Sequence, residues 1–361
     1  MKISTLFIVL IIAAFGIFIF VRSQNQFELP KGKTIPLDDA TSNLSNKNNG
    51  GQVNSDNSIS TKQERIMQRS TRKIFITDGT KHSIPLNEIL SGGPPKDGIP
   101  SIDNPKFILT TEADEFLESR DPGLGFIWKG EARFYPYQIL VFHEIVNDTI
   151  QGDPVLVTYC PLCATGIVFE RLVDGKGEEF GVSGKLWQSN LLMYNRSSDP
   201  QKESLWSQVL GEAVLGESTG MKLVILSSDT VRYGDWKKKN PGTKVPSRDT
   251  GAARSYGRDP YGDYYTNTSV SFGATFNDTR LHPKAFVFGI ELDGKFKAYH
   301  EDALQEGVTV DTFAGRKITI EKSSIGEVRM FAGENKTSLP YIGCFWFSWL
   351  AVHPETELFK Q

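Results

Sequence analysis

The sequence predicts an α+β fold rich in β structure, with several antiparallel hairpins and short helices, preceded by an N-terminal transmembrane helix. Three observations predict this fold class. The first is an apolar run that fills residues 6–21. The second is a series of short β-prone runs, cut by glycine turns, from Lys73 onward. The third is a hairpin followed by a short helix, a pattern that occurs three times along the chain.

The apolar run lies between Lys2 and Arg22. A segment this apolar and this close to the N-terminus does not fold alone in water, so residues 1–22 predict a membrane-targeting segment. It is either a cleaved signal peptide or a retained anchor. The exit sequence Phe20-Val-Arg-Ser-Gln favours the anchor because it lacks an Ala-x-Ala-like cleavage site. We therefore expect a single-pass protein of the cell membrane, with its globular domain outside the cytoplasm.

Two further parts follow this segment. Residues 23–72 are rich in Asn, Ser, Gln and Lys and show no apolar period, which predicts a disordered polar linker. Residues 73–361 are expected to form a single β-rich globular domain. The formal net charge of −3 gives no basic surface, so nucleic acid is not expected as a partner. The expected partners are the membrane, through residues 1–22, and exported or envelope proteins.

The three hairpins share a spacing around their turn glycines, which are Gly79, Gly130 and Gly294. An apolar or aromatic residue lies five positions after each glycine, a helix-start residue lies six after it, and another apolar residue lies ten after it. Proline is the helix-start residue in two of the copies, as expected at a first helical turn. The spacing predicts a three-fold hairpin–helix repeat.

The most distinctive stretch is a Cys-Pro-Leu-Cys turn with a β-prone run on each side, in residues 155–169. Two thiols three residues apart at a turn can face the same point, where they can form a disulfide or bind one soft metal ion. Three cysteines are too few for a disulfide scaffold. We therefore expect Cys160 and Cys163 to act as a pair, with Cys344 as an extra thiol.

A metal site at this turn needs ligands beyond the two sulfurs, and His143, Met193 and His353 are the candidates. No second Cys-x-x-Cys occurs, which argues against a closed structural zinc site. A copper-type mixture of thiolate, imidazole and thioether ligands remains open. The first functional hypothesis is soft-metal binding or handling, copper more than zinc, by Cys160, Cys163 and His143.

Nearby polar residues support this hypothesis. Glu144 directly follows His143 and can orient its imidazole. The turn that begins at Asp148 can fold the histidine back toward the cysteines. Arg258 and Asp259, in a polar aromatic loop, can bind calcium or an anionic ligand, although Asx turns also hold such loops together.

Two other uses of the cysteine pair remain open. As a thiol–disulfide oxidoreductase site, Cys-Pro-Leu-Cys resembles the Cys-Pro-x-Cys of glutaredoxin-like active sites. Those motifs precede a helix, whereas the residues after Cys163 are β-prone. As a structural disulfide, the pair would stabilise a non-enzymatic envelope scaffold. Whether the protein is an enzyme therefore stays open.

Other motifs add two expectations. The chain has no sequence motif of nucleotide-binding, zincin or α/β-hydrolase sites, so neither a nucleotide nor a flavin is expected. Six Asn-x-Ser/Thr sequons fit a glycoprotein with modified surface loops. The sequons are at Asn43, Asn147, Asn195, Asn267, Asn277 and Asn335.

Motifs spread along the chain resemble those of one protein family. They are residues 92–106, Tyr135-Pro136, and residues 143–148, 158–163, 180–184, 204–208, 258–262 and 345–349. Over roughly residues 73–357, the chain resembles the domain-of-unknown-function family 3179. Cys344 and residues 1–72 are not part of this pattern. The resemblance implies no particular reaction, because the family carries no established one, so function has to be argued from the site.

Overall fold

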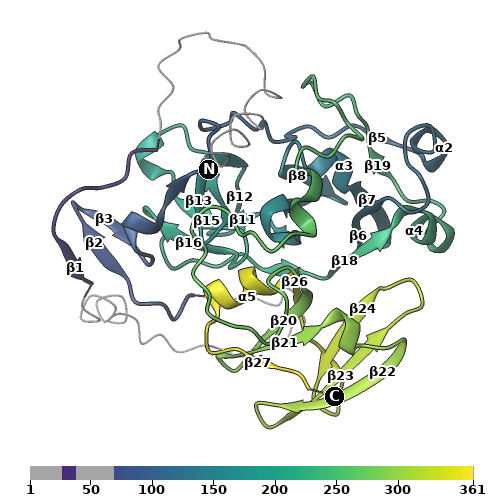
Figure 1. Cartoon of the computed structure of the whole chain (residues 1–361). Coiled ribbons are helices and arrows are strands. Elements are labelled where there is room, and N and C mark those ends of the chain that lie inside the picture. The colour runs from purple at the N-terminus through teal and green to yellow at the C-terminus, as the bar shows by residue number, and fades with distance from the viewer. Residues whose placement is uncertain (1–26, 38–68, 361) are drawn as a thin grey trace, which may run out of the picture.

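The computed structural model describes residues 27–37 and 69–360 (Figure 1). Strands dominate, and the α-helices of the described residues are only four to seven residues long. These helices are α2 (Thr110–Ala113), α3 (Tyr137–Leu140), α4 (Tyr233–Lys239) and α5 (Trp346–Val352). The sheets are arranged like the blades of a four-bladed propeller. The predicted α+β class is therefore wrong, because helices this short do not form a layer of their own.

The transmembrane helix that the sequence predicts as part of the fold also needs correction. No helix of the described residues is long and apolar enough to cross a membrane. The segment concerned, residues 1–22, lies outside the described residues. The structure therefore does not support the predicted single-pass anchor or the predicted location at the cell membrane.

The largest sheet has eight strands in the order β1-β2-β3-β16-β15-β14-β13-β4, with antiparallel neighbours. It joins strands near the N-terminus to the middle of the chain, at the left and centre of Figure 1. Its strands are β1 (Thr34–Pro36), β2 (Phe75–Thr77), β3 (Thr80–His82), β4 (Leu90–Ser91), β13 (Phe180–Trp187), β14 (Asn190–Asn195), β15 (Leu205–Ser207) and β16 (Glu212–Leu215).

Part of the predicted linker belongs to this sheet. β1 pairs with β2, and the side chains of Phe27 and Leu29 pack against the largest apolar core. Residues 38–68 lie outside the described residues. The division of the chain into segment, linker and domain stays a prediction.

The cysteine turn belongs to a four-stranded antiparallel sheet in the order β17-β10-β9-β8. Its strands are β8 (Ile145–Ile150), β9 (Asp153–Cys160), β10 (Thr165–Glu170) and β17 (Ile225–Leu226). The 3₁₀ turn η3 (Pro161–Cys163) joins β9 to β10. Six of the eight β9 residues are buried, as expected of a strand covered on both faces.

Two further sheets share one construction, in which a hairpin pairs with a strand that leads into a helix. The first has the order β18-β6-β7 and the second the order β26-β20-β21-β27. Their strands are β6 (Pro122–Trp128), β7 (Glu131–Pro136), β18 (Ser228–Arg232), β20 (Phe286–Leu292), β21 (Lys295–His300), β26 (Ile342–Phe345) and β27 (Glu357–Leu358). Helix α4 follows β18, and α5 follows β26.

The remaining elements are short or lie at the edge. One sheet has the order β22-β23-β24-β25, and two ladders have two strands each, β11-β12 and β19-β5. These strands are β5 (Phe107–Ile108), β11 (Leu172–Val173), β12 (Lys176–Gly177), β19 (Val245–Pro246), β22 (Gly307–Phe313), β23 (Arg316–Lys322), β24 (Val328–Ala332) and β25 (Thr337–Ser338). The other 3₁₀ turns are η2 (Leu86–Glu88), η4 (Pro200–Lys202), η5 (Gly262–Tyr265) and η6 (Glu301–Ala303).

The three hairpins of the predicted repeat lie in three different sheets, and each precedes a single short helical element. Two of them share a contact that sequence spacing did not reveal. In each, a strand glycine meets a helix tryptophan, whose indole N–H donates to a threonine seven residues later. The contacting residues are Gly125, Trp236 and Thr243 in one sheet, and Gly289, Trp349 and Thr356 in the other.

We expect Gly289→Ala to lower the free energy of unfolding by about 1–3 kcal/mol, as overpacking of a core does. A Cβ atom at Gly289 would lie 2.4 Å from the Trp349 ring, too close for any carbon contact. Denaturant unfolding measures the change. The control is Gly242→Ala, because a Cβ there would have no heavy atom within 4 Å. Equal stability of Gly289→Ala and wild type would contradict the close packing.

His353 ends helix α5 and is buried between two aromatic rings. Its ring centroid lies 3.8 Å from that of Phe296 and 4.3 Å from that of Trp349. Burial lowers the pKa of His353 well below its usual value, and the positive charges of Arg72 and Lys222 lower it further. The folded protein therefore keeps this imidazole neutral at a pH where the unfolded chain protonates it.

Stability should fall as the pH drops below about 6.5, because the unfolded state then binds a proton that the folded state does not. We expect His353→Phe, which keeps an aromatic ring but cannot titrate, to lose less stability than wild type between about pH 7 and pH 5. Urea unfolding at each pH tests this. Above about pH 7.5 the two proteins should show the same pH dependence, and parallel curves throughout would refute the assignment.

Candidate functional site

The Cys-Pro-Leu-Cys turn closes the β9–β10 hairpin directly, since Cys160 and Thr165 are partners in the ladder. Pro161 occupies the first position of the 3₁₀ turn, where its fixed φ suits the geometry and its missing N–H costs nothing. Ala164 ends the turn in the left-handed conformation, and Thr165 donates its hydroxyl to the Cys163 carbonyl at 3.1 Å. The turn is therefore built by local residues, and a strand follows it rather than a helix.

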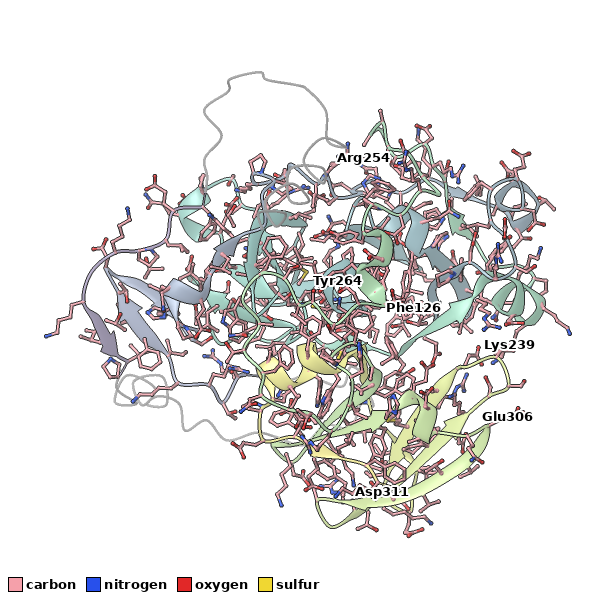
Figure 2. The ribbon with its side chains drawn as sticks, viewed as in Figure 1. Phe126, Lys239, Arg254, Tyr264, Glu306 and Asp311 are labelled. Carbon is pink, nitrogen blue, oxygen red and sulfur yellow. The ribbon has the colours of Figure 1, made fainter. Side chains whose placement is uncertain are left out.

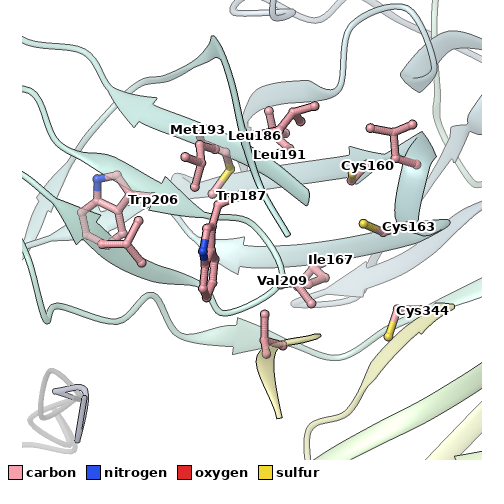
Figure 3. Close-up of a cluster of buried hydrophobic side chains, with 14 of the residues drawn as sticks. Cys160, Cys163, Ile167, Leu186, Trp187, Leu191, Met193, Trp206, Val209 and Cys344 are labelled. Atoms are coloured by element: carbon pink, nitrogen blue, oxygen red, sulfur yellow. The ribbon is translucent and has the colours of Figure 1, made fainter. Parts of the chain in front are cut away.

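The two thiols converge on one backbone oxygen. Cys163 Sγ lies 3.2 Å from the Ser189 carbonyl oxygen and Cys160 Sγ lies 3.9 Å from it. The Cys163 side chain is also within hydrogen-bonding reach of Cys160, and all three cysteines are thiols in this structure. Figure 3 shows the two sulfurs near each other, with Cys344 apart from them. Cys160 is 2% exposed and Cys163 is 0% exposed, so the pair is buried.

Ser189 belongs to a two-residue turn between β13 and β14. Gln188 and Ser189 both have positive φ, as this turn type requires, although neither is the glycine or asparagine that favours it. The Gln188 side chain donates to Glu88 at 2.9 Å and accepts from the Thr275 N–H at 2.6 Å. The Ser189 N–H donates to the Phe272 carbonyl at 3.2 Å. These contacts hold the Ser189 carbonyl against the sulfurs.

Backbone strain is concentrated around the pair. In the described chain, thirteen non-glycine residues have positive φ, and seven of them directly precede a glycine that also has positive φ. Of the other six, four surround the cysteines: Glu144, Ala164, Gln188 and Ser189. Each costs about 1–2 kcal/mol in an L-residue, and such strain persists at sites where the surrounding structure holds it.

Of the adjacent residues His143 and Glu144, it is Glu144 that interacts with Cys160. Its backbone has φ 59°, donates to the Leu140 carbonyl at 2.7 Å and accepts from the Tyr159 N–H at 2.8 Å. Burial raises the pKa of the Glu144 carboxyl well above its usual value, and the nearby Cys160 adds to this shift. Burial also raises the pKa of the Cys160 thiol, with Cys163 adding to it. Both groups are therefore held in their neutral, protonated forms.

A segment rich in tyrosine, residues 256–267, covers the turn, and we name it the tyrosine roof. The Tyr264 hydroxyl donates to the Leu162 carbonyl, between the two cysteines, at 3.0 Å. The Lys284 ammonium donates to the Tyr264 carbonyl and lies 3.5 Å from the centre of its ring. Tyr264 is buried and lies near the centre of the view in Figure 2, with Arg254, just before the roof, near the upper edge. The roof separates the sulfurs from solvent.

His143 lies beneath the same roof but makes other contacts. Its Nδ1 donates to the Pro100 carbonyl at 2.7 Å, and its Nε2 accepts from the Tyr256 hydroxyl at 2.6 Å. Burial lowers the pKa of His143, which favours this neutral form. Both ring nitrogens thus have partners, and the structure does not bring this imidazole to the cysteines.

The other predicted ligands also lie elsewhere. His353 stacks between Phe296 and Trp349, as described above. Met193 lies on β14, fully buried, apart from the cysteines in Figure 3. Asp148 accepts from the Tyr135 hydroxyl at 2.5 Å. Within the described ranges no group of three or more His, Cys, Asp or Glu residues is arranged to hold a metal ion. The copper or zinc site stays a prediction.

Two other sets of predicted residues have clear structural roles. Asp259 accepts from the Tyr261 N–H at 2.8 Å in an Asx turn, while Arg258 is exposed beside it. Asn147 and Asn195 are buried, and their side chains bond to Asp103 and to Trp206. A glycan cannot be attached to these two sequons in this fold, because their amides point into the protein.

Sequence reasoning missed Ser189 and Asn190, which contact the sulfurs, and Gln208, which bonds to Asn190. Asn190 and Gln208 are 1% and 0% exposed and hydrogen bonded to each other at 2.9 Å. The available signal was a polar residue next to an apolar run, Leu191–Met193 in one case and Val209-Leu210 in the other. A polar side chain that is buried in this way has to find a partner inside the protein.

Comparison with known proteins gives one match. The family model described as "Protein of unknown function (DUF3179)" matches residues 96–338, which include the cysteine turn, Glu144, Asn190 and most of the tyrosine contacts. No curated protein and no solved structure matches the chain. The resemblance expected from the motifs is therefore confirmed, although the aromatic motif at residues 345–349 lies beyond the matched stretch. The chain belongs to the DUF3179 family of proteins of unknown function.

Proposed function

We propose that Cys160 and Cys163 form a dithiol–disulfide redox site. The observation that carries this proposal is the convergence of both thiols on the Ser189 carbonyl, within reach of each other. Two cysteines at the ends of a single 3₁₀ turn are close enough to be joined by one S–S bond. The strained residues around them support a functional rather than a purely structural role.

The proposed reaction is exchange with a small disulfide, R–S–S–R. The two thiols lose two hydrogens and form the Cys160–Cys163 bond, and the disulfide is reduced to two molecules of R–SH. A thiol must lose its proton before it attacks. Glu144 can accept the Cys160 proton only after it has lost its own, because burial holds its carboxyl in the protonated form.

The substrate class follows from burial. The sulfurs are at most 2% exposed and lie under the tyrosine roof, so the cysteine of a folded protein cannot reach them there. A low-molecular-weight thiol or disulfide needs a much smaller opening. No helix begins after Cys163, so the site lacks the helix N-terminus that lowers thiol pKa values in glutaredoxin-like proteins.

Charge also favours redox chemistry over metal binding. Dithiol and disulfide are both neutral, and a buried apolar site tolerates a neutral pair at little cost. A copper(I) ion on two thiolates would leave one net negative charge beside the buried Glu144 carboxyl. His143, the predicted third ligand, already has partners at both ring nitrogens.

Titration with mixtures of a small thiol and its disulfide should give one two-electron transition, with a midpoint above about −300 mV. Cys160→Ser and Cys163→Ser should each abolish the transition, because a single thiol cannot form the internal bond. Cys344→Ser is the matched control, since this buried thiol lies apart from the pair and should leave the transition unchanged. A midpoint well below about −300 mV would indicate a structural disulfide instead.

Metal content separates this proposal from soft-metal handling. We expect the purified protein, and Cys160→Ser purified in parallel, to carry the same low amounts of copper and zinc. Elemental analysis after dialysis measures this. Stoichiometric copper or zinc in wild type, lost in Cys160→Ser, would favour the metal site over the redox site.

A further inference from the structure

A cavity that the proposed redox site does not use lies beside the first strands of the eight-stranded sheet. Its volume is about 610 Å³, within the range of about 300–1,000 Å³ that is typical of small-molecule sites. Its walls come from residues 29–34, from the β2–β3 hairpin at the left of Figure 1, and from η2. The walls are mostly apolar, and the apolar side chains are those of Leu29, Pro30, Phe75, Ile84, Pro85 and Leu86.

Strand register places four of the lining side chains on one face of the sheet. Thr34 is the partner of Thr77 in the β1–β2 ladder, and Phe75 is the partner of His82 in the β2–β3 ladder. Phe75 and Thr77 are two residues apart in β2, so their side chains point to the same face. The sheet therefore presents two hydroxyl groups, an imidazole and an aromatic ring to this cavity.

Hydrogen bonds join the two hydroxyl groups and the imidazole. Thr34 Oγ1 lies 2.7 Å from Thr77 Oγ1, which in turn lies 2.9 Å from His82 Nε2. His82 Nδ1 donates to the Ile84 carbonyl at 2.8 Å, because a carbonyl oxygen can only accept. In a neutral imidazole the other nitrogen, Nε2, is then the acceptor.

The direction of this hydrogen-bond chain leaves the Thr34 oxygen as an acceptor. Thr77 gives its one hydroxyl hydrogen to His82 Nε2, so Thr34 has to give its own to Thr77. Only lone pairs of Thr34 Oγ1 remain, and Thr34 is an exposed residue of the cavity wall. A ligand can therefore bond to this oxygen only through a donor such as O–H or N–H.

Ser83 adds a further polar group to the wall. Its Oγ atom is buried and has no hydrogen-bond partner among the residues that the structure describes. A buried hydroxyl without a partner is unfavourable, and a polar ligand atom can supply the missing partner.

The apolar part of the wall suits a flat ring. The Phe75 ring stacks on the His82 ring, with their centroids 5.8 Å apart and an angle of 27° between their planes. Aromatic side chains pack well against other rings in offset-stacked or edge-to-face arrangements. A ligand ring can thus lie against Phe75 while its polar group reaches Thr34, because both side chains are on the same face of the sheet.

We propose that this cavity binds a small aromatic molecule that carries a hydroxyl or N–H group. The ring packs against Phe75 and the aliphatic side chains of the wall, and the O–H or N–H group donates to Thr34 Oγ1. The site is separate from the cysteine pair, so this proposal does not rest on the proposed redox function.

Two fluorescent probes of nearly equal size test the proposal on the full-length protein. 2-Naphthol carries a hydroxyl donor, whereas 2-methoxynaphthalene has only an ether oxygen, which can accept but not donate. Fluorescence titration should show saturable binding of 2-naphthol, about fivefold tighter than that of 2-methoxynaphthalene, the effect of one hydrogen bond. Equal affinities for the two probes, or no saturable binding of either, would overturn the proposal.

Three variants locate the binding. Thr34→Val keeps the shape of the side chain but removes the acceptor, so the preference for 2-naphthol should disappear. Thr80→Val is the matched control, because Thr80 lies on β3 of the same sheet but does not line the cavity, and it should keep the preference. Leu29→Trp fills part of the cavity and should weaken both probes at least fivefold. A preference that survives in Thr34→Val, or unchanged binding in Leu29→Trp, would refute the site.

Discussion

The site depends on one backbone group, the Ser189 carbonyl, which both thiols approach. A β-hairpin would place this oxygen at lower cost with asparagine and glycine in its turn. Here Gln188 and Ser189 keep the left-handed conformation because Glu88 binds them from one segment, and Phe272 and Thr275 bind them from another. The eight-stranded sheet, the loop that contains Phe272 and Thr275, and the cysteine turn therefore meet at this carbonyl, and a change in any of them alters the surroundings of the sulfurs.

The Ser189 carbonyl also favours one redox state of the cysteine pair, dithiol or disulfide, over the other. In the dithiol form, two S–H groups are available to a buried oxygen that needs a donor. Disulfide formation removes both donors and leaves the oxygen in a strained turn that cannot rotate toward another partner. The fold thus favours the reduced form, and a couple whose reduced form is stabilised is a comparatively strong oxidant. The preference for the dithiol form is small because S–H groups are weak donors. The geometry determines that the dithiol, and not the disulfide, is the favoured form.

The sequence predicted local structure well, but it predicted poorly which distant segments contact each other. The hairpin that carries Cys160 and Cys163 follows from the β-branched runs on either side of the Cys-Pro-Leu-Cys turn. The three hairpins of the predicted repeat also lie where their turn glycines indicate. The α+β class was wrong because the short helices that the sequence predicted end after one or two turns and form no layer of their own. The choice between His143 and Glu144 could not be made from sequence, since it depends on the left-handed backbone of Glu144 and on the distant partners of His143, Pro100 and Tyr256. Asn190 was missed because its contact spans 27 residues of chain.

The same arrangement also determines how substrate and solvent reach the sulfurs. The tyrosine roof is attached to the turn at Leu162, between the two cysteines, and at His143, beside Glu144. Each of these attachments is a single hydrogen bond worth about 1 kcal/mol net, and Lys284 also binds the carbonyl and the ring of Tyr264. Under the proposed reaction, closing a disulfide across Leu162 displaces the carbonyl that holds Tyr264. The oxidation state of the pair and the position of its cover are then coupled through one contact, and the turn that carries the chemistry also controls what can reach it.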